Sequence, residues 1–135
     1  GVHIDMVVRG ICCLRAGVPD ETDNIHIISI VGRYLEHSRI YILGRGERAR
    51  YYIGSADWMT RSTLRRVEIA APVTAPALKA RLQHIFNTML ADNSNARVQQ
   101  PDGSYVRRMP GADAVDCQAQ FYEEAYQANV HSDLK

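Results

Sequence analysis

The chain has 135 residues, enough for one domain whose hydrophobic core needs no disulfide or metal to hold it together. Hydrophobic residues make up 46% of the chain and charged residues 23%, a composition that excludes a disordered or fibrous protein. No apolar run approaches the roughly 18 residues of a membrane span, and the opening segment lacks the apolar stretch of a signal peptide. Three cysteines without metal-ligand spacing (Cys12, Cys13 and Cys117) indicate reduced thiols.

The net charge of +1 conceals an uneven distribution of charge along the chain. Fourteen of the 16 basic residues are arginines, whose planar guanidinium binds phosphate or carboxylate through two parallel hydrogen bonds. Residues 33–66 hold eight arginines against three acids, a charge of +5, whereas residues 109–135 carry −4. A coding bias toward arginine would explain the composition but not this clustering. The basic middle segment therefore suggests an anionic partner.

Hydrophobic alternation predicts several strands in the first half of the chain. The first two span residues 3–9 and 25–30, with a Gly- and Pro-containing loop at 17–24 between them. A short helix capped by Ser29 is expected to follow, with Ile30, Val31, Tyr34 and Leu35 on one face. Strands at 38–43 and 50–53 would form a hairpin around the turn at 44–47, and a buried strand is expected at 67–73.

The second half of the chain contains the clearest helix, which we expect to start after Thr74 and end near residues 93–95. Its core-facing stripe consists of Leu78, Leu82, Ile85, Phe86, Met89 and Leu90. A turn at 101–104 leads to a strand at 105–108. A last helix is expected from about Asp113, with a stripe of Val115, Ala119, Tyr122 and Tyr126.

These elements, with no repeat or linker among them, predict one α/β domain over residues 1–135, with a mixed β-sheet flanked by helices. The chain does not begin with methionine, and its first strand starts at once. We therefore expect it to be a piece of a longer protein.

Among the five histidines, His37 has the sequence context most typical of a functional residue. It is expected at a junction between a helix and a strand, close in sequence to Arg33 and Arg39. Nearby cations favour the neutral imidazole, which can act as a base or a nucleophile. The other four histidines, at the chain ends, in a strand and at a helix edge, have ordinary structural explanations (His3, His26, His84 and His131).

The segment after His37 resembles a half-site of the phospholipase D superfamily. His37-Ser38-Arg39 opens one strand, and Gly54-Ser55-Ala56-Asp57 follows the next. In that superfamily a histidine is the nucleophile, while a small hydroxyl and an amide hold phosphate oxygens. The chain departs from the pattern, since Arg39 replaces a lysine, Gly44 an aspartate and Asp57 an asparagine. Arg39, Ser55 and Asp57 are thus weaker site candidates.

Longer stretches of the sequence make the resemblance more specific. Residues 4–14, 29–40, 52–59 and 65–68 resemble, in that order, the last domain of bacterial polyphosphate kinase, and the turn at 101–105 also fits. The resemblance implies a phospholipase D-like domain of an enzyme that reversibly transfers the terminal phosphate of ATP to inorganic polyphosphate, with Mg²⁺. It further implies a cytoplasmic protein, also at the membrane periphery, that forms homo-oligomers at full length and binds no specific nucleic acid.

The resemblance also implies roles for individual residues. His37 matches a catalytic histidine and Arg9 an arginine on the opening strand, and both contact the nucleotide phosphates of ATP or ADP. Arg66, the second arginine of a pair, matches another phosphate-facing position. The phosphorylated histidine of the family lies in the preceding domain, so the chain is expected to be inactive alone and to depend on other domains of its polypeptide. No Mg²⁺ ligand is assigned within the chain.

For several of these residues a purely structural role is the alternative. Arg66 would pair only with Glu68 or Glu36, and Ser55 and Asp57 would bond turn amides. Trp58, Met59, Cys12 and Cys13 would be packing residues.

Two other functions remain open on the sequence. One is a phosphodiesterase of the phospholipase D type, active as a homodimer. The other is a non-catalytic module that binds polyanions such as polyphosphate or nucleic acid and keeps its affinity without His37.

Overall fold

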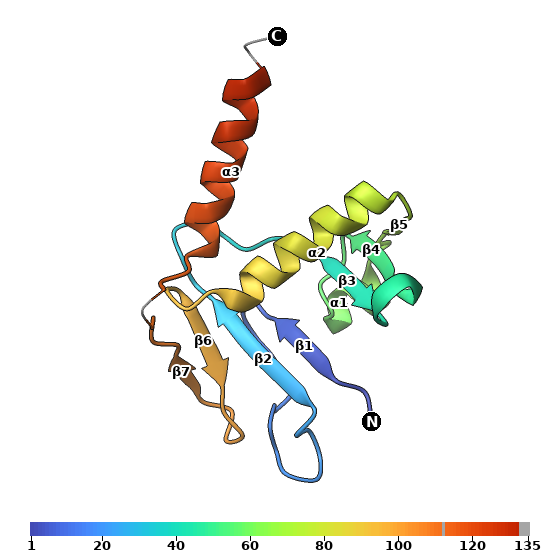
Figure 1. Ribbon diagram of the computed structural model, residues 1–135. Helices are drawn as coiled ribbons and strands as arrows, with labels where there is room; N and C mark the ends of the chain where they lie inside the picture. Colours follow the sequence, from blue (N-terminus) through green and yellow to red (C-terminus); the bar gives the residue numbers. More distant parts are fainter. Residues whose placement is uncertain (112, 133–135) are drawn as a thin grey trace. The chain divides into compact units, whose positions relative to one another are not determined.

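The computed structural model describes residues 1–111 and 113–132, and the chain divides into two compact units (Figure 1). Unit 1 contains residues 1–36 and the chain from residue 88 onward, and unit 2 contains residues 37–87. The fold is of the predicted mixed α/β class, with its strands in two sheets of four and three. Lys135, which entered the charge of the tail, and the side chain of His131 lie outside the described residues.

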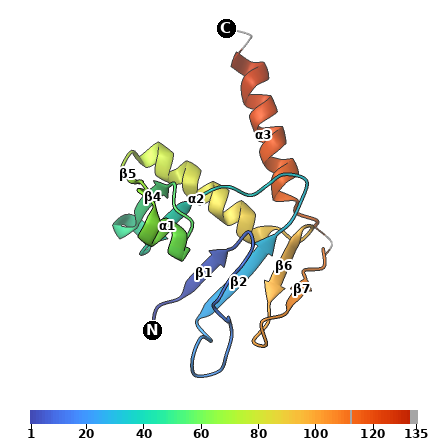
Figure 2. The same ribbon diagram turned by 180° about the vertical axis from the view of Figure 1, so that it is seen from behind.

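The four-stranded sheet of unit 1 has the order β1-β2-β6-β7, visible from both sides in Figures 1 and 2. Its strands are β1 (Ile4–Val7), β2 (Ile25–Ile30), β6 (Ala96–Gln99) and β7 (Tyr105–Arg107). β1 and β2 run parallel, and the other two pairs are antiparallel. Ile27 and Ile28 point to opposite faces of β2 and both are fully buried, so this inner strand forms the centre of the unit's core.

The predicted helix after Ser29 is wrong. Ser29 lies within β2, and residues 31–39 form an irregular segment of bends. Gln118 explains the difference, because its side chain forms hydrogen bonds with both the N–H and the carbonyl of Tyr34. Its Oε1 accepts the Tyr34 N–H at 2.9 Å, and its Nε2 donates to the Tyr34 carbonyl at 2.8 Å and to the Glu36 carboxylate. A long-range contact thus replaces the local hydrogen bonds of a helix.

Asp92 organises the second half of unit 1 and is fully buried. Its Oδ1 accepts the N–H groups of Ser94, Asn95 and Ala96, and its Oδ2 accepts the N–H of Cys117. The carboxylate therefore joins the end of one helix, the start of β6 and the start of the last helix, α3 (Cys117–Ser132). Strand β6 has no counterpart in the sequence prediction, and α3 begins four residues later than expected.

Unit 2 contains the antiparallel sheet β3-β4-β5, with strands Ile40–Leu43, Arg50–Gly54 and Ala70–Val73. The short helix η1 (Gly46–Arg48) lies in the hairpin, and α1 (Thr60–Arg65), which was not predicted, joins β4 to β5. The predicted burial at 67–73 is wrong, since Val67 is 99% exposed and Ile69 70%. β5 is an edge strand, where Pro72 needs no N–H partner and apolar residues remain uncovered.

Helix α2 (Pro76–Ala91) has the predicted extent, and its stripe is partly confirmed. Met89 is buried and Leu82, Ile85, Phe86 and Leu90 are half-buried, whereas Leu78 is 58% exposed. The stripe predicted for the last helix is largely uncovered, because Tyr122 and Tyr126 are exposed on α3. No helix among the described residues combines the length and the apolar character that crossing a membrane requires.

Three of the four residues expected to pack, namely Trp58, Met59 and Cys13, are exposed. Trp58 is 81% exposed and its ring lies 5.8 Å from that of Tyr41, while Met59 is also exposed. Cys13 is exposed and Cys12 is half-buried. All three cysteines are free thiols, and burial together with the neighbouring Asp92 carboxylate raises the pKa of Cys117.

Leu82→Ala and Phe86→Ala are each expected to lower the free energy of unfolding by about 1–3 kcal/mol, less than fully buried side chains would. Both side chains are half-buried on α2, so truncation removes only part of a core contact. Leu78→Ala is the matched control on the same helix, with an expected change below about 0.5 kcal/mol. Denaturant unfolding measures all three, and equal losses at Leu78 and Leu82 would contradict the assigned face.

Candidate functional site

The carboxyl ends of β1 and β2 meet at one edge of the sheet of unit 1, because the two strands are parallel. Arg9 follows β1 there, at the strand end that the sequence predicted, and its Nη1 donates to the carbonyl of Glu36 at 3.2 Å. Arg9 and the segment 30–36 line a hollow of about 210 Å³. Ligands of α/β sheets commonly bind at this edge, and a guanidinium in a hollow suits an anionic ligand.

A second hollow of about 390 Å³ also includes Arg9. Its other lining residues come from the strand ends and from neighbouring strands of the same sheet: Gly10, Ser29, Val31, Arg97 and Tyr105. Arg97 was not among the predicted site residues, because the strand that carries it was not predicted. The alternating residues of 96–99, opposite the predicted strand at 105–108, were the signal that could have found it.

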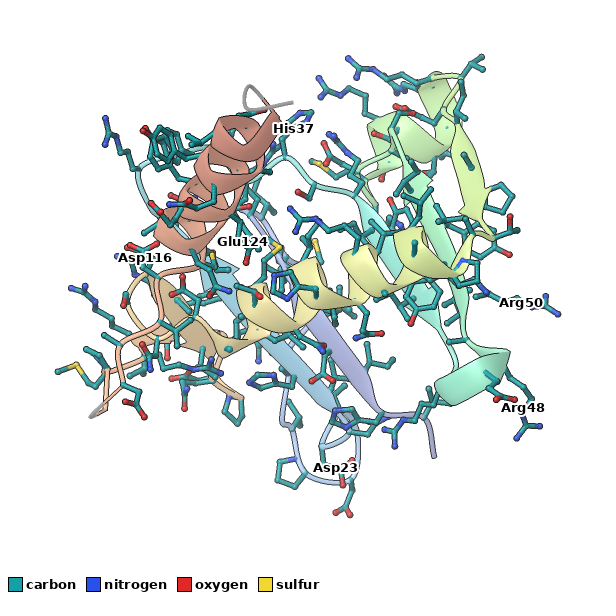
Figure 3. The ribbon with its side chains drawn as sticks, turned by 45° about the horizontal axis from the view of Figure 1, so that its top comes forward. Asp23, His37, Arg48, Arg50, Asp116 and Glu124 are labelled. Atoms are coloured by element: carbon teal, nitrogen blue, oxygen red, sulfur yellow. The ribbon has the colours of Figure 1, made fainter. Side chains whose placement is uncertain are left out.

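In unit 2, one arginine joins His37 to Asp57. The Nη2 and Nε atoms of Arg39 lie 3.0 and 3.2 Å from Asp57 Oδ1, and its Nη1 lies 2.9 Å from His37 Nδ1. The same Nη1 donates to the His37 carbonyl at 3.2 Å. These contacts leave only 14% of the Arg39 side chain exposed, whereas His37 is exposed. His37 lies on the segment before β3 and is labelled in Figure 3.

The shortest contact of Arg39 with the His37 ring favours one tautomer of the imidazole. A guanidinium has no acceptor, so the Nδ1 atom at 2.9 Å must offer its lone pair. The contacts to Nε2 are longer, at 3.4 Å. A neutral His37 with its proton on Nε2 fits this arrangement, and that N–H can donate a hydrogen bond to a phosphate oxygen.

Ser55 and Arg66 lie elsewhere in unit 2. The Ser55 hydroxyl donates to the Glu68 carboxylate and accepts the N–H of Ile69 at 3.0 Å, so it holds the segment before β5 against the end of β4. This agrees with its structural explanation. Arg66 follows α1 and is exposed, and no carboxylate of unit 2 (residues 37–87) forms an ion pair with it. The expected pairing of Arg66 with Glu68 is therefore wrong, and the pairing with Glu36, which belongs to unit 1, stays a prediction.

The structure thus brings His37, Arg39 and Asp57 together, with Ser55 and Arg66 at other places of unit 2 and Arg9 in unit 1. The Asp57 carboxylate accepts from the guanidinium of Arg39, and its expected bonds to turn amides stay a prediction. The described residues include no group of three histidine, cysteine, aspartate or glutamate side chains that could hold a metal ion. Since Arg39 also engages Asp57, the residues present do not fit a Mg²⁺ site, and we derive no step through the ion.

Comparison with known proteins places these residues in a family context. The family model described as polyphosphate kinase C-terminal domain 2 matches residues 1–120. The chain is 54% identical over 112 residues to a polyphosphate kinase of Synechocystis sp., covering 83% of the chain and 15% of that protein. With the polyphosphate kinase of Bacillus anthracis it shares 45% over 128 residues, covering 94% and 18%.

A solved structure agrees with these sequence matches. The crystal structure of polyphosphate kinase from Porphyromonas gingivalis matches with a TM-score of 0.87 and 35% identity, over 94% of this chain and 20% of that one. The chain thus spans only about a sixth of the length of the curated relatives it matches.

Proposed function

The chain belongs to the polyphosphate kinase family, as its C-terminal domain 2, and from this premise we propose that it serves an ATP–polyphosphate phosphotransferase. The reaction is the reversible transfer of the terminal phosphate of ATP to inorganic polyphosphate. The observation that carries the proposal is the family match over residues 1–120, within which Arg9, His37 and Arg66 all fall.

The residues of the site suit this reaction. Phosphoryl transfer depends mostly on positioning and on cations or donors around the phosphate oxygens. Arg9, exposed at the carboxyl edge of the parallel strands, offers a fork of donors to the nucleotide phosphates. His37 supplies an Nε2–H held in place by Arg39, and the exposed Arg66 contributes a further cation.

In our proposal, other domains of the enzyme supply the groups that this chain lacks for the reaction. The preceding domain supplies the phosphorylated histidine, so the chain alone is inactive. Mg²⁺ supplies charge neutralisation on the phosphates when bound, with ligands that we do not assign to this chain. Exposed apolar side chains such as Trp58 and Val67 support contacts with other domains or a second copy. The free thiols support a cytoplasmic location.

Arg9→Lys in the kinase that contains this domain is expected to lower kcat/KM for ATP by about 5- to 150-fold, as loss of a charge-assisted fork predicts. Lysine keeps the charge but cannot hold two oxygens in one plane. Arg15→Lys, at an exposed position of the same unit, is the control and should retain parental rates. Initial rates across ATP concentrations measure both variants, and an Arg9→Lys enzyme as fast as its parent would remove Arg9 from the site.

The phosphodiesterase alternative is disfavoured by the contact at His37. A nucleophilic imidazole needs a free lone pair on the attacking nitrogen. In the tautomer that we infer from the 2.9 Å contact, Nδ1 accepts from Arg39 and Nε2 carries the proton. We therefore assign His37 the role of a hydrogen-bond donor, and we expect the chain to release no chromogenic alcohol from a phosphodiester.

A further inference from the structure

The larger hollow of unit 1 is lined by residues that the sheet aligns in one row. Ser29 of β2 lies opposite Arg97 of β6, and Arg97 lies opposite Arg107 of β7. Residues directly opposite in neighbouring strands project from the same face, so the two arginines and the serine share one side of the sheet. Tyr105 lies two residues before Arg107 on that side, and Arg9 closes the hollow at the end of β1.

This row carries positive charge that no carboxylate of the described residues balances. No carboxylate in the described part of the chain forms an ion pair with Arg97 or Arg107, and Arg107 only donates its Nη2 to the carbonyl of Ser94, at 2.9 Å. Like charges directly opposite across a β-ladder destabilise the pair. An anion between the strands would remove that repulsion, and the half-buried Arg97 lies in the wall of the hollow where such an anion would bind.

Hydroxyl donors complete the lining. Tyr105 accepts a hydrogen bond from Gln99 Nε2 at 3.1 Å, which leaves its own O–H to donate to a ligand. Ser29 brings a second hydroxyl from the neighbouring strand into the same hollow. Guanidinium and hydroxyl donors together suit the oxygens of a phosphate.

We propose that this hollow binds phosphoryl units of the polyphosphate chain that lie beyond the reacting one, an inference that rests on the proposed function. The two hollows of unit 1 share Arg9, so a linear polyanion held at the carboxyl edge continues along the sheet face to Arg97. Arg97 is then a determinant of affinity for long chains, and the transfer step itself does not need it.

Binding by the 135-residue chain provides the first test, with long-chain polyphosphate and orthophosphate as probes in isothermal titration. Arg97→Gln is expected to weaken polyphosphate binding about tenfold and to reduce the salt dependence of the affinity by about one unit of slope. Arg48→Gln is the matched control, because it removes the same charge from an exposed side chain of unit 2 that points into solvent in Figure 3. Equal losses in both variants would overturn the proposal in favour of diffuse charge attraction.

Two further measurements separate a binding role from a structural one. Arg97→Lys keeps the charge and should retain most of the affinity that Arg97→Gln loses, while thermal unfolding by circular dichroism checks that both variants fold. In amide-detected NMR, long-chain polyphosphate should shift the signals of Ser29, Arg97 and Tyr105. Absence of these shifts in the parent chain would overturn the proposal, even if Arg97→Gln failed to fold.

Turnover by the kinase that contains this domain distinguishes this inference from the function on which it rests. Arg97→Gln should raise KM for long-chain polyphosphate about tenfold and leave KM for ATP unchanged. If Arg9→Lys impairs transfer while Arg97→Gln leaves KM for polyphosphate unchanged, only the second subsite is overturned. If neither variant changes any rate or KM, the proposed function of this edge fails as well.

Discussion

His37→Ala is expected to abolish most phosphoryl transfer in the kinase that contains this domain, while the free energy of unfolding changes by less than about 0.5 kcal/mol. His37 is exposed, and Arg39 is the partner that holds its ring. Removal of the ring therefore leaves no cavity and no buried group without a partner. Initial rates and thermal unfolding of the same preparation measure the two effects separately.

Replacing His37 with glutamine or with asparagine tests whether its Nε2–H is the hydrogen-bond donor. The amide nitrogen of a glutamine at this position can reach the place of Nε2, whereas that of an asparagine reaches only the place of Nδ1. We expect His37→Gln to retain more activity than His37→Asn, because the Nε2–H is the proposed donor. An alanine variant that is less stable but fully active would show instead that His37 only supports the backbone.

Asp92→Ala is expected to lower the free energy of unfolding by about 3–5 kcal/mol, the largest effect on stability of any single change considered. The substitution leaves four backbone N–H groups without their acceptor, at Ser94, Asn95, Ala96 and Cys117. Asp92→Asn keeps one oxygen for the first three and should lose less. Urea unfolding at pH 7 measures all three proteins, and equal stability of parent and alanine variant would contradict the role of Asp92.

The same carboxylate predicts a dependence of stability on pH. Burial alone would raise the pKa of Asp92, but hydrogen bonds from Cys117, Asn95 and Ala96 outweigh it and lower the pKa below its ordinary value of 3.8. Asp92 therefore stabilises the fold fully above about pH 3.8, and this contribution is lost as the pH falls through the lowered value in the folded state. Asp92→Asn should remove that part of the acid-induced loss.

Strands rich in apolar residues were predictable from the sequence, and elements decided by distant contacts were not. β2 reads as Ile25–Ile30 in both sequence and structure because apolar residues fill an inner strand on both faces. The segment 31–39 has an apolar spacing of 3–4 residues that favours a helix. Gln118, more than 80 residues away in the chain, satisfies its backbone instead. β6 was missed because the alternation in its sequence, Ala-Arg-Val-Gln, extends over only four residues.

The candidate site divides in the same way. The sequence predicted that Arg9 lies at the end of a strand and that His37 lies before one. Both predictions came from the expected order of the strands and from the stretches of sequence that resemble the family. The link between His37 and Asp57 through Arg39 could not be derived, because it depends on the side-chain direction of an arginine between two elements. Arg97 likewise depends on the register of a strand that composition does not reveal.

Because Gln118 lies so close to Gly32, we expect correlated substitutions at these two positions, which are distant in the sequence. A Cβ added at Gly32 would lie 2.9 Å from Gln118 Cδ, and Gln118 cannot move aside without losing its bonds to Tyr34 and Glu36. Any larger residue at position 32 therefore requires a shorter one at 118, and the shorter one no longer reaches Tyr34. Members of the family should change both positions in one lineage or neither, and those that change both must hold the segment before His37 by other contacts.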